Sequence, residues 1–292
     1  GQAVGASVHL DFSRHMREIL ELNVEERWVR VQPGVVLDEL NAFLAPHGLQ
    51  FGPDVSTSSR ANLGGMIGNN SCGAHSILYG KTIDHVIDLT VVLADGEVTR
   101  LGSPETVGAD AVAGIQSIES GLREHIPRIV QDYEEQIRAR FPAVMRRVSG
   151  YNLDALLPPA PLDLSRLVVG SEGTLCAITE ATLNLVERPQ DSLVVACHFH
   201  DLAEAMDANL VALETSPSAS ELMDRLLLDQ TGGSLEYAPR RSFLVGEPQS
   251  LLFVEYYASD ADQLHEKAND LEARLRGAGL GYAYVRAEEK SL

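Results

Sequence analysis

The sequence has few cysteines, few aromatic residues and no long apolar run. Its three cysteines, Cys72, Cys176 and Cys197, show no C-x-x-C spacing, so a disulfide framework is excluded and a reducing compartment is favoured. Aromatic residues make up 5% of the chain, with Trp28 the single tryptophan, which argues against a stacking platform for bases. No apolar run approaches the roughly 18 residues that cross a bilayer. We therefore expect a cytoplasmic protein without a transmembrane segment, and leave open a peripheral attachment of the full-length protein to the inner membrane.

Basic residues are scarce relative to acidic ones. The chain has 23 Lys and Arg against 42 Asp and Glu, a formal net charge of −19. Such a surface repels phosphate backbones and anionic membranes, so no nucleic-acid partner is expected. An organic acid that binds as a ligand would need a local patch of basic residues to offset the negative potential of this surface. With 292 residues, 45% of them hydrophobic, the chain is otherwise an ordinary globular protein of about two domains.

Periodicity predicts three short elements before residue 50. The alternation of residues 8–12 indicates a strand, and residues 28–32 indicate a second one. Apolar residues with a 3.6-residue period predict a helix over residues 37–46. The next segment, residues 52–81, is rich in Gly, Asn and Ser and has little periodicity. A loop region this long inside a compact domain usually has a function when it is ordered.

A hairpin and a helical region are predicted next. Strands over residues 86–93 and 98–101 are joined by a turn at Asp95-Gly96. Residues from about 104 to 147 are predicted to be helical, with oppositely charged side chains four residues apart.

Two further strands and a second domain complete the prediction. Residues 167–169 and 177–186 are predicted strands, and Pro189 indicates a domain boundary. Beyond it the order of elements is β-α-β followed again by β-α-β, which indicates a small α+β domain. Its predicted strands are residues 193–199, 251–257 and 281–286, and its predicted helices begin at Asp201 and cover residues 261–276.

The most informative motif is G-G-M-I-G-N-N-S-C-G-A-H at residues 64–75. Its glycines allow sharp turns and a close approach of the backbone to a ligand, and successive amides can form an anion site. It contains no lysine, which excludes a Walker loop, and its G-G-x-x-G spacing does not match a Rossmann fingerprint. Composition alone leaves a cofactor loop and an irregular loop equally favoured.

Several motifs in a fixed order resemble the FAD-binding oxidases of the vanillyl-alcohol oxidase and p-cresol methylhydroxylase (PCMH) type. The nearest branch contains D-lactate dehydrogenase, the glycolate oxidase flavin subunit and D-2-hydroxyglutarate dehydrogenase. The resemblance is strong over residues 1–188 and looser beyond them. The motifs are Pro53-Asp54, residues 64–70, Tyr79-Gly80-Lys81, residues 170–175 and residues 178–180.

This resemblance implies an FAD site and an α+β fold. The fold would be a two-subdomain PCMH-type FAD-binding domain over residues 1–188, with a helical insertion at about 104–147. Part of a ferredoxin-like substrate (cap) domain would follow over residues 189–292. The FAD would be bound non-covalently. The residues expected to bind it are Pro53, Asp54, Gly64, Gly65, Gly68, Asn69, Cys72, Gly73, His75, Tyr79, Gly80, Glu172, Gly173 and Ile178.

The resemblance also implies a reaction and its partners. A 2-hydroxy acid would give a hydride to flavin N5. The electrons would pass to an iron–sulfur domain, a quinone or a cytochrome. A [4Fe-4S] cluster is expected only in a further C-terminal region. The family's first pyrophosphate loop precedes Gly1-Gln2, so the chain resembles a fragment, and no catalytic residue is assigned. The alternatives are a non-redox transferase of the alkyl-dihydroxyacetone-phosphate synthase type and a truncated module without activity.

Three other clusters have competing interpretations. Cys72 and His75 could form a nucleophile pair, but a structural role is favoured, and a covalent link from His75 to the flavin is a minor alternative. Cys197, His198 and His200 could suggest zinc, yet further ligands are lacking, so no metal site is predicted and surface histidines at a strand end are favoured. Glu221, Asp224 and Arg225 either resemble a cap-domain strand that faces the flavin or belong to an ordinary charged strand or helix end, and the two interpretations are equally favoured.

Overall fold

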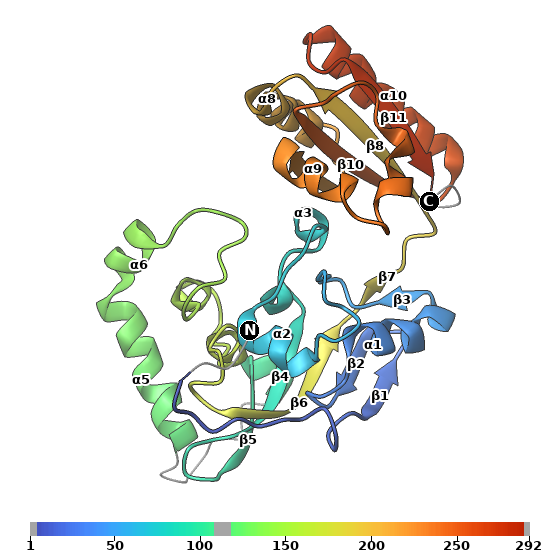
Figure 1. Ribbon diagram of the computed structural model, residues 1–292. Helices are drawn as coiled ribbons and strands as arrows, with labels where there is room; N and C mark the ends of the chain where they lie inside the picture. Colours follow the sequence, from blue (N-terminus) through green and yellow to red (C-terminus); the bar gives the residue numbers. More distant parts are fainter. Residues whose placement is uncertain (1–4, 108–117, 289–292) are drawn as a thin grey trace. The chain divides into compact units, whose positions relative to one another are not determined.

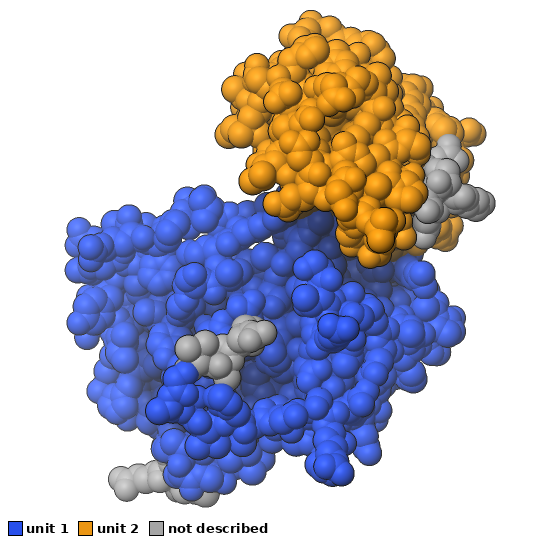
Figure 2. Space-filling view, viewed as in Figure 1, with its two compact units in different colours: residues 1–188 blue, residues 189–292 orange. Residues whose placement is uncertain are grey.

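The computed structural model describes residues 5–107 and 118–288, which belong to two compact units, Gly1–Arg188 and Pro189–Leu292. Figures 1 and 2 show the two units. Each mixes helices with antiparallel sheet, as expected for the α+β class.

The first unit is built on a five-stranded antiparallel sheet. Its strand order is β1-β2-β6-β4-β5, so β6, which comes late in the sequence, lies between β2 and β4. The strands are β1 (Ile19–Asn23), β2 (Trp28–Val31), β4 (Val86–Val92), β5 (Val98–Gly102) and β6 (Ala177–Asn184). A small second sheet pairs β3 (Leu49–Gln50) with β7 (Val186–Glu187). The predicted hairpin is confirmed, because β4 pairs with β5.

Short helices cover one face of this sheet. They are α1 (Leu37–Leu44), α2 (Leu63–Asn69) and α7 (Ser165–Val168). Leu40 of α1 and Ile67 of α2 join Val29, Leu89 and Leu183 of the strands in one buried cluster. The apolar residues of each strand alternate, so the same face of all central strands is buried. The remaining short elements are η1 (Ala45–His47), α3 (Ser76–Tyr79), η2 (Thr82–Asp84) and η4 (Leu153–Leu156).

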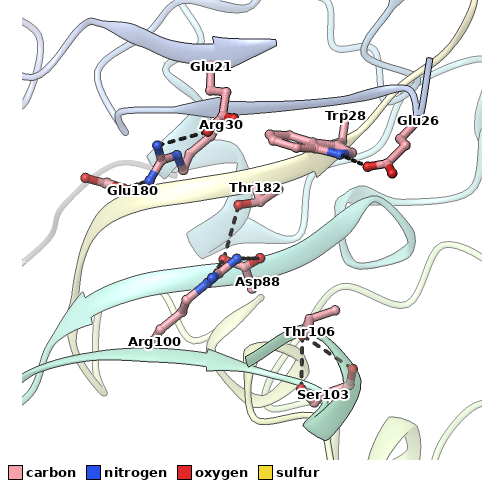
Figure 3. Close-up of polar contacts among 10 residues, drawn as sticks. All are labelled: Glu21, Glu26, Trp28, Arg30, Asp88, Arg100, Ser103, Thr106, Glu180 and Thr182. Atoms are coloured by element: carbon pink, nitrogen blue, oxygen red, sulfur yellow. Dashed lines mark hydrogen bonds and ion pairs between the residues drawn. The ribbon is translucent and has the colours of Figure 1, made fainter. Parts of the chain in front are cut away.

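The opposite face of the sheet carries a row of paired polar side chains (Figure 3). Asp88 is 3% exposed, and its carboxylate accepts two bonds from the Arg100 guanidinium, at 2.8 and 2.7 Å. The Thr182 hydroxyl donates a third bond to it at 3.1 Å. This hydrogen bonding to Asp88 raises the pKa of Arg100. A buried carboxylate is tolerated here because all its neighbours donate to it.

The predicted helical region is confirmed as far as Arg140 where the structure describes it, whereas residues 141–147 form no helix. It contains α4 (Pro104–Val107), α5 (Ile118–Asp132) and α6 (Glu134–Arg140), while residues 108–117 lie outside the described residues. Glu134 and Arg138 form the expected pair at 2.8 Å. Val130 and Ile137 pack with Leu156 and Leu167 in a separate small core.

The second unit has a four-stranded antiparallel sheet with the order β11-β8-β10-β9. Helices α8 and α10 pack on one face of it, where Ala205, Ala208 and Leu271 meet Val195 and Val254. The strands are β8 (Asp191–Phe199), β9 (Ala219–Asp224), β10 (Ser250–Ala258) and β11 (Ala283–Glu288); the helices are α8 (Leu202–Leu213), α9 (Arg225–Gly232), η5 (Ala238–Phe243) and α10 (Ala261–Gly277).

The helix begun at Asp201 is confirmed by its cap. The Asp201 side chain accepts a hydrogen bond from the Glu204 amide at 2.8 Å, which satisfies one of the free donors at the start of α8. Asp260 caps α10 in the same way through the Gln263 amide, at 2.9 Å.

Three secondary-structure expectations are wrong. Residues 8–12 form no strand, because no described strand pairs with them, and Val8 is 86% exposed. Residues 167–169 belong to a helical turn and not to a strand; Asp163 holds the start of this turn by accepting bonds from the Ser165 amide and hydroxyl. Residues 52–81 are not all irregular, since they contain α2 and α3.

The paired polar side chains on this sheet face predict that two substitutions will lower the stability of the protein by different amounts. Asp88→Ala leaves the buried Thr182 hydroxyl and the Arg100 guanidinium without their acceptor, so the free energy of unfolding should fall by roughly 2 kcal/mol in urea denaturation. Glu21→Ala is the control, because Glu21 pairs with Arg30 at 3.1 Å on an exposed part of the same face. Its effect should stay within about 0.5 kcal/mol. Equal losses in the two variants would contradict this account of Asp88.

Candidate functional site

The first unit contains an open cavity of about 960 Å³. Its walls come from four parts of the chain that lie far apart in sequence: the N-terminal segment, Pro33 after β2, helix α2, and the turn after α7 with the start of β6. The lining residues are Ser7, Val8, His9, Leu10, Phe12, Pro33, Gly64, Gly65, Gly68, Ser171, Glu172, Gly173, Thr174, Cys176, Ala177 and Ile178.

Backbone hydrogen bonds join helix α2 to the turn at residues 170–173. The Gly170 amide donates to the Ile67 carbonyl and the Glu172 amide to the Gly68 carbonyl, both at 2.9 Å. The Asn69 side-chain amide also donates to the Glu172 carboxylate at 2.8 Å. The C-terminal carbonyls of a helix have no partner within the helix. Here the turn satisfies two of them, and the two glycine-rich motifs of the sequence become one wall of the cavity.

The glycines of this wall have distinct steric roles. A Cβ on Gly64 would lie 2.6 Å from the Pro33 Cβ, so only glycine allows this approach. A Cβ on Gly65 would meet nothing within 4 Å, which leaves the backbone open to the cavity. Gly170 and Gly173 have φ of +83° and +71° in the turn, a conformation that glycine adopts without strain.

Asn70 fixes the chain just after α2. It is fully buried with φ of +54°, the left-handed conformation that Asn tolerates better than most residues. Its side-chain oxygen accepts a bond from the Ile83 amide at 3.0 Å. The loop after α2 is therefore tied to η2.

A second cluster contains the other predicted residues. The imidazole Nδ1 of His75 lies 2.9 Å from the Asp54 carboxylate, whose other oxygen accepts the His75 amide at 3.3 Å. A Cβ on Gly73 would lie 2.3 Å from the Asp54 carbonyl oxygen. The Tyr79 carbonyl lies 2.7 Å from Nε2 of buried His85. The loop between α2 and α3 is thus held against the segment that follows Phe51.

The predicted site residues divide between these two places. Six of them line the cavity, and Asn69 is hydrogen-bonded to one of these six. The six are Gly64, Gly65, Gly68, Glu172, Gly173 and Ile178. The remaining residues belong to the second cluster or its flanking loop and are not among the cavity lining: Pro53, Asp54, Cys72, Gly73, His75, Tyr79 and Gly80.

Sequence reasoning missed part of the lining. Ser171, Thr174 and Cys176 lie inside or beside the motif at residues 170–175. Their position next to predicted FAD-binding residues was the signal that could have identified them. Pro33 was considered only as a strand stop. Residues 8–12 are predicted as a strand, and a strand pattern gives no indication that side chains face a ligand cavity.

Burial keeps the two nearby thiols protonated. Burial raises the pKa of Cys176 to about 11. Burial also raises the pKa of Cys72, although Arg146 and Lys81 oppose the rise. The thiolate is the reactive form of cysteine, so a structural role for Cys72 is favoured over a nucleophilic one.

The histidines of the second unit are arranged differently from the expectation. His198 is fully buried, so its assignment to the surface is wrong. Its Nδ1 lies 3.0 Å from the Ala196 carbonyl oxygen. Within residues 5–107 and 118–288, no three His, Cys, Asp or Glu side chains are grouped as metal ligands.

Asp224 and Arg225 form a charged helix end. Asp224 caps α9 by accepting the Leu227 amide at 2.9 Å, and Arg225 pairs with Asp229 and Glu247, each at 2.8 Å. Glu221 lies on β9 opposite Phe253 of β10.

Comparison with known families agrees with this geometry. The FAD binding domain family matches residues 1–102, and the family of FAD linked oxidases, C-terminal domain, matches residues 188–292.

The chain belongs to the PCMH-type FAD-linked oxidase family.

Relatives of this FAD-linked oxidase chain carry the names of dehydrogenases and of a glycolate oxidase subunit. It is 34% identical to D-2-hydroxyglutarate dehydrogenase of Pantoea ananatis over 97% of its own length and 29% of that protein. Identity to the Haemophilus influenzae protein of the same name is 39%, over 75% of the chain and 22% of that protein. The glycolate oxidase subunit GlcD of Bacillus subtilis is 29% identical, over 73% of the chain and 35% of that protein. The chain thus spans about a third or less of the length of these relatives.

Among solved structures, alkyldihydroxyacetonephosphate synthase is similar in fold. The TM-score is 0.60 at 17% identity, covering 94% of this chain and 43% of the synthase. At this identity the likeness shows the fold alone.

Among the described helices, none has the length and apolar character that a bilayer crossing needs.

The Asp54–His75 pair predicts a pH effect on stability. Burial alone would raise the pKa of Asp54, but the hydrogen bond and charge of His75 outweigh it, and the pKa is lowered. The folded state then binds fewer protons at Asp54 than the unfolded state, whose pKa is about 3.9. The stabilisation is present above that pH and is lost as the pH falls through the folded pKa. Asp54→Asn should therefore be less stable than the wild type at pH 7 in urea denaturation.

The difference between these two proteins should begin to shrink below about pH 4 and vanish only below the lowered folded pKa of Asp54, where both proteins lack the charge. Glu25→Gln, at an exposed position, is the control and should follow the wild type at every pH. A gap between the wild type and Asp54→Asn that stays constant from pH 7 to pH 3 would count against an ionised Asp54.

Proposed function

We propose that this chain forms the flavin-binding part of an FAD-dependent dehydrogenase that oxidises a 2-hydroxy acid. The observation that carries the proposal is the glycine-lined cavity between α2 and the turn at residues 170–173. The names of the relatives indicate the substrate class: D-2-hydroxyglutarate, D-lactate or glycolate. Residues 1–188 would be the FAD-binding domain and residues 189–292 part of the substrate (cap) domain.

The cavity wall fits a dinucleotide cofactor. Gly65 and Gly68 leave its backbone uncovered, which allows a pyrophosphate to approach closely. Although the chain has a net charge of −19, Glu172 is the one acidic residue among the described lining residues, and its carboxylate accepts a bond from Asn69. An anionic ligand would therefore meet little repulsion at this wall. Ile178, Ala177 and neutral Cys176 provide an apolar part for a flat ring.

The residues of the chain would have binding and positioning roles. When bound, FAD supplies the acceptor for the hydride of the substrate α-carbon. Gly64, Gly65 and Gly68 would contact the cofactor through the backbone, and the turn at Glu172-Gly173 would extend the same wall. The second cluster, with Asp54 and His75, would hold the loop that continues from this wall. The base that takes the hydroxyl proton is assigned to none of the described residues.

The electron acceptor is a further part of the proposal. An iron–sulfur domain, a quinone or a cytochrome would take the electrons, and any [4Fe-4S] cluster would belong to a region outside this chain. One relative, from Arabidopsis thaliana, carries the name D-lactate dehydrogenase [cytochrome]; it is 32% identical over 74% of the chain.

A second candidate is a non-redox transferase with the same fold. The likeness to alkyldihydroxyacetonephosphate synthase favours it. However, that identity is 17%, whereas the named dehydrogenases reach 34% over 97% of the chain. The sequence comparison therefore favours the dehydrogenase.

Filling the cavity at Gly65 should weaken FAD binding without unfolding the protein. In Gly65→Leu the new side chain projects into open space, and leucine has a higher helix propensity than glycine. Titration of FAD, followed by quenching of its fluorescence, should show binding weaker by about tenfold or more, equivalent to about 1.4 kcal/mol. The melting temperature without FAD should not fall.

The matched control is Gly277→Leu. Gly277 ends α10 in the second unit, and a Cβ there also meets nothing within 4 Å. This variant should bind FAD as the wild type does. Unchanged FAD affinity in Gly65→Leu would remove the cavity from consideration as the cofactor site.

The substrate class is tested by flavin reduction. The FAD-loaded gene product that carries this chain should be mixed anaerobically with D-2-hydroxyglutarate, D-lactate and glycolate, and with the L-isomers of the first two. Loss of flavin absorbance together with formation of the 2-oxo acid is expected with at least one of these acids. If FAD binds and none of them bleaches it, the non-redox alternative gains support.

A further inference from the structure

One loop of the second unit is hydrogen-bonded to the sheet through both the backbone amide and the backbone carbonyl of Val245. The Val245 amide donates to Nε2 of His198 at 3.3 Å, and the Val245 carbonyl accepts the Tyr282 hydroxyl at 2.8 Å. Val245 lies next to the end of a segment that contains α9 and η5, residues 225–246, named here the lid segment. His198 belongs to β8, and Tyr282 directly precedes β11.

The lid segment lies on the sheet face that α8 and α10 leave uncovered. Leu252 and Val254 of β10 belong to the core under these helices, so Phe253 between them points to the opposite face. The Phe243 ring of η5 packs edge-on against Phe253, with ring centroids 5.8 Å apart. His198 lies between the core residues Cys197 and Phe199 and points to the same face as Phe253.

The hydrogen bonds of His198 determine its tautomer. Nδ1 lies 3.0 Å from the Ala196 carbonyl oxygen, which can only accept, so Nδ1 carries the proton. Nε2 then has a free lone pair and accepts the Val245 amide. An imidazolium has protons on both nitrogens and cannot accept this bond. The Phe243 and Ala283 carbonyls lie close enough to interact with the ring.

The surroundings of His198 favour its neutral form. The residue is fully buried, and this burial lowers its pKa. From β10 and β11 its paired residues are Leu251 and Ala283. The titratable group in contact with it is Tyr282, whose ring centroid is 5.9 Å away.

Other ionisable groups lie one step further from the imidazole. The His200 ring stacks on the Tyr282 ring, with the two centroids 4.4 Å apart. Glu204 accepts the amides of His200 and Gly281, and Glu247 acts on Tyr282 by its charge. No described carboxylate forms an ion pair with His198 to stabilise its protonated form.

We infer that His198 is a pH-sensitive latch: its neutral imidazole holds the lid segment on the sheet through the Val245 amide, and its protonation releases that segment. On protonation, the bond from the Val245 amide is lost and a charge is buried; the nearby carbonyl groups offset only part of the cost of this burial. The hydrogen bond from the Tyr282 hydroxyl to the Val245 carbonyl remains. The lid segment therefore opens only locally, and the core under α8 and α10 stays packed.

The direction of the pH effect follows from the histidine. The open form exposes His198 and has a pKa near 6.5, whereas the closed form has a lower pKa. Between these two values the open form binds more protons, so the closed form loses stability as the pH falls. Above about pH 7 the latch should be fully closed.

Amide hydrogen exchange measures the latch directly, because the Val245 amide is the group that bonds to His198. After correction for the intrinsic effect of pH, protection of residues 225–246 should fall between pH 7.5 and pH 5, by up to about tenfold per pH unit. Protection in α10 should change little. Nitrogen NMR of His198 should show the Nδ1–H tautomer at neutral pH.

Three variants separate the latch from a general loss of stability. His198→Gln should remove the pH dependence of the lid segment. His200→Gln should keep it, although His200 contacts the same tyrosine. Tyr282→Phe should lower protection of residues 225–246 by a similar factor at every pH and leave the slope unchanged, because it removes the bond to the Val245 carbonyl.

Two results would overturn the inference. One is a wild-type lid segment whose protection changes no more with pH than that of α10. The other is a His198→Gln protein that retains the pH dependence. Should His198→Gln fail to fold, the wild-type exchange profile and Tyr282→Phe still decide the question, because both leave the imidazole in place.

Discussion

The candidate site depends on one contact between distant parts of the chain. The turn at residues 170–173 donates two backbone hydrogen bonds to the last carbonyls of α2, across about a hundred residues of intervening sequence. Without this contact, the two glycine-rich motifs would be separate loops and the cavity would lack one wall. Because the donors and acceptors are peptide groups, the contact depends on the backbone conformation of the turn. Gly170 and Gly173 adopt the positive φ that this turn requires.

Elements whose causes are local could be predicted from the sequence. The hairpin turn at Gly96 and the helix begun at Asp201 are examples, because a turn residue and a capping carboxylate act within a few residues. Elements that depend on distant partners could not. Residues 8–12 have a strand pattern but no described partner strand, and residues 167–169 are an apolar run too short to distinguish a strand from a helical turn.

The site shows the same division. Gly64, Gly65, Gly68, Glu172 and Gly173 were found because the motifs and the family resemblance mark them, and all five line the cavity. The pairing of His75 with Asp54 has no signal in the spacing of the two residues, which lie 21 positions apart. His198 was misplaced because a polar residue near a strand end is usually exposed, whereas here two backbone partners allow its burial.

The row of polar side chains on the outer sheet face also limits how β4 can pair. Neighbouring residues of a strand point to opposite faces, so a slip of β4 by one position would turn Asp88 into the aliphatic layer and Leu89 toward Arg100 and Thr182. An unpaired carboxylate among aliphatic side chains is strongly unfavourable. The Asp88–Arg100 pair therefore selects one alignment of β4 and β5 among those that the backbone hydrogen bonds alone would permit.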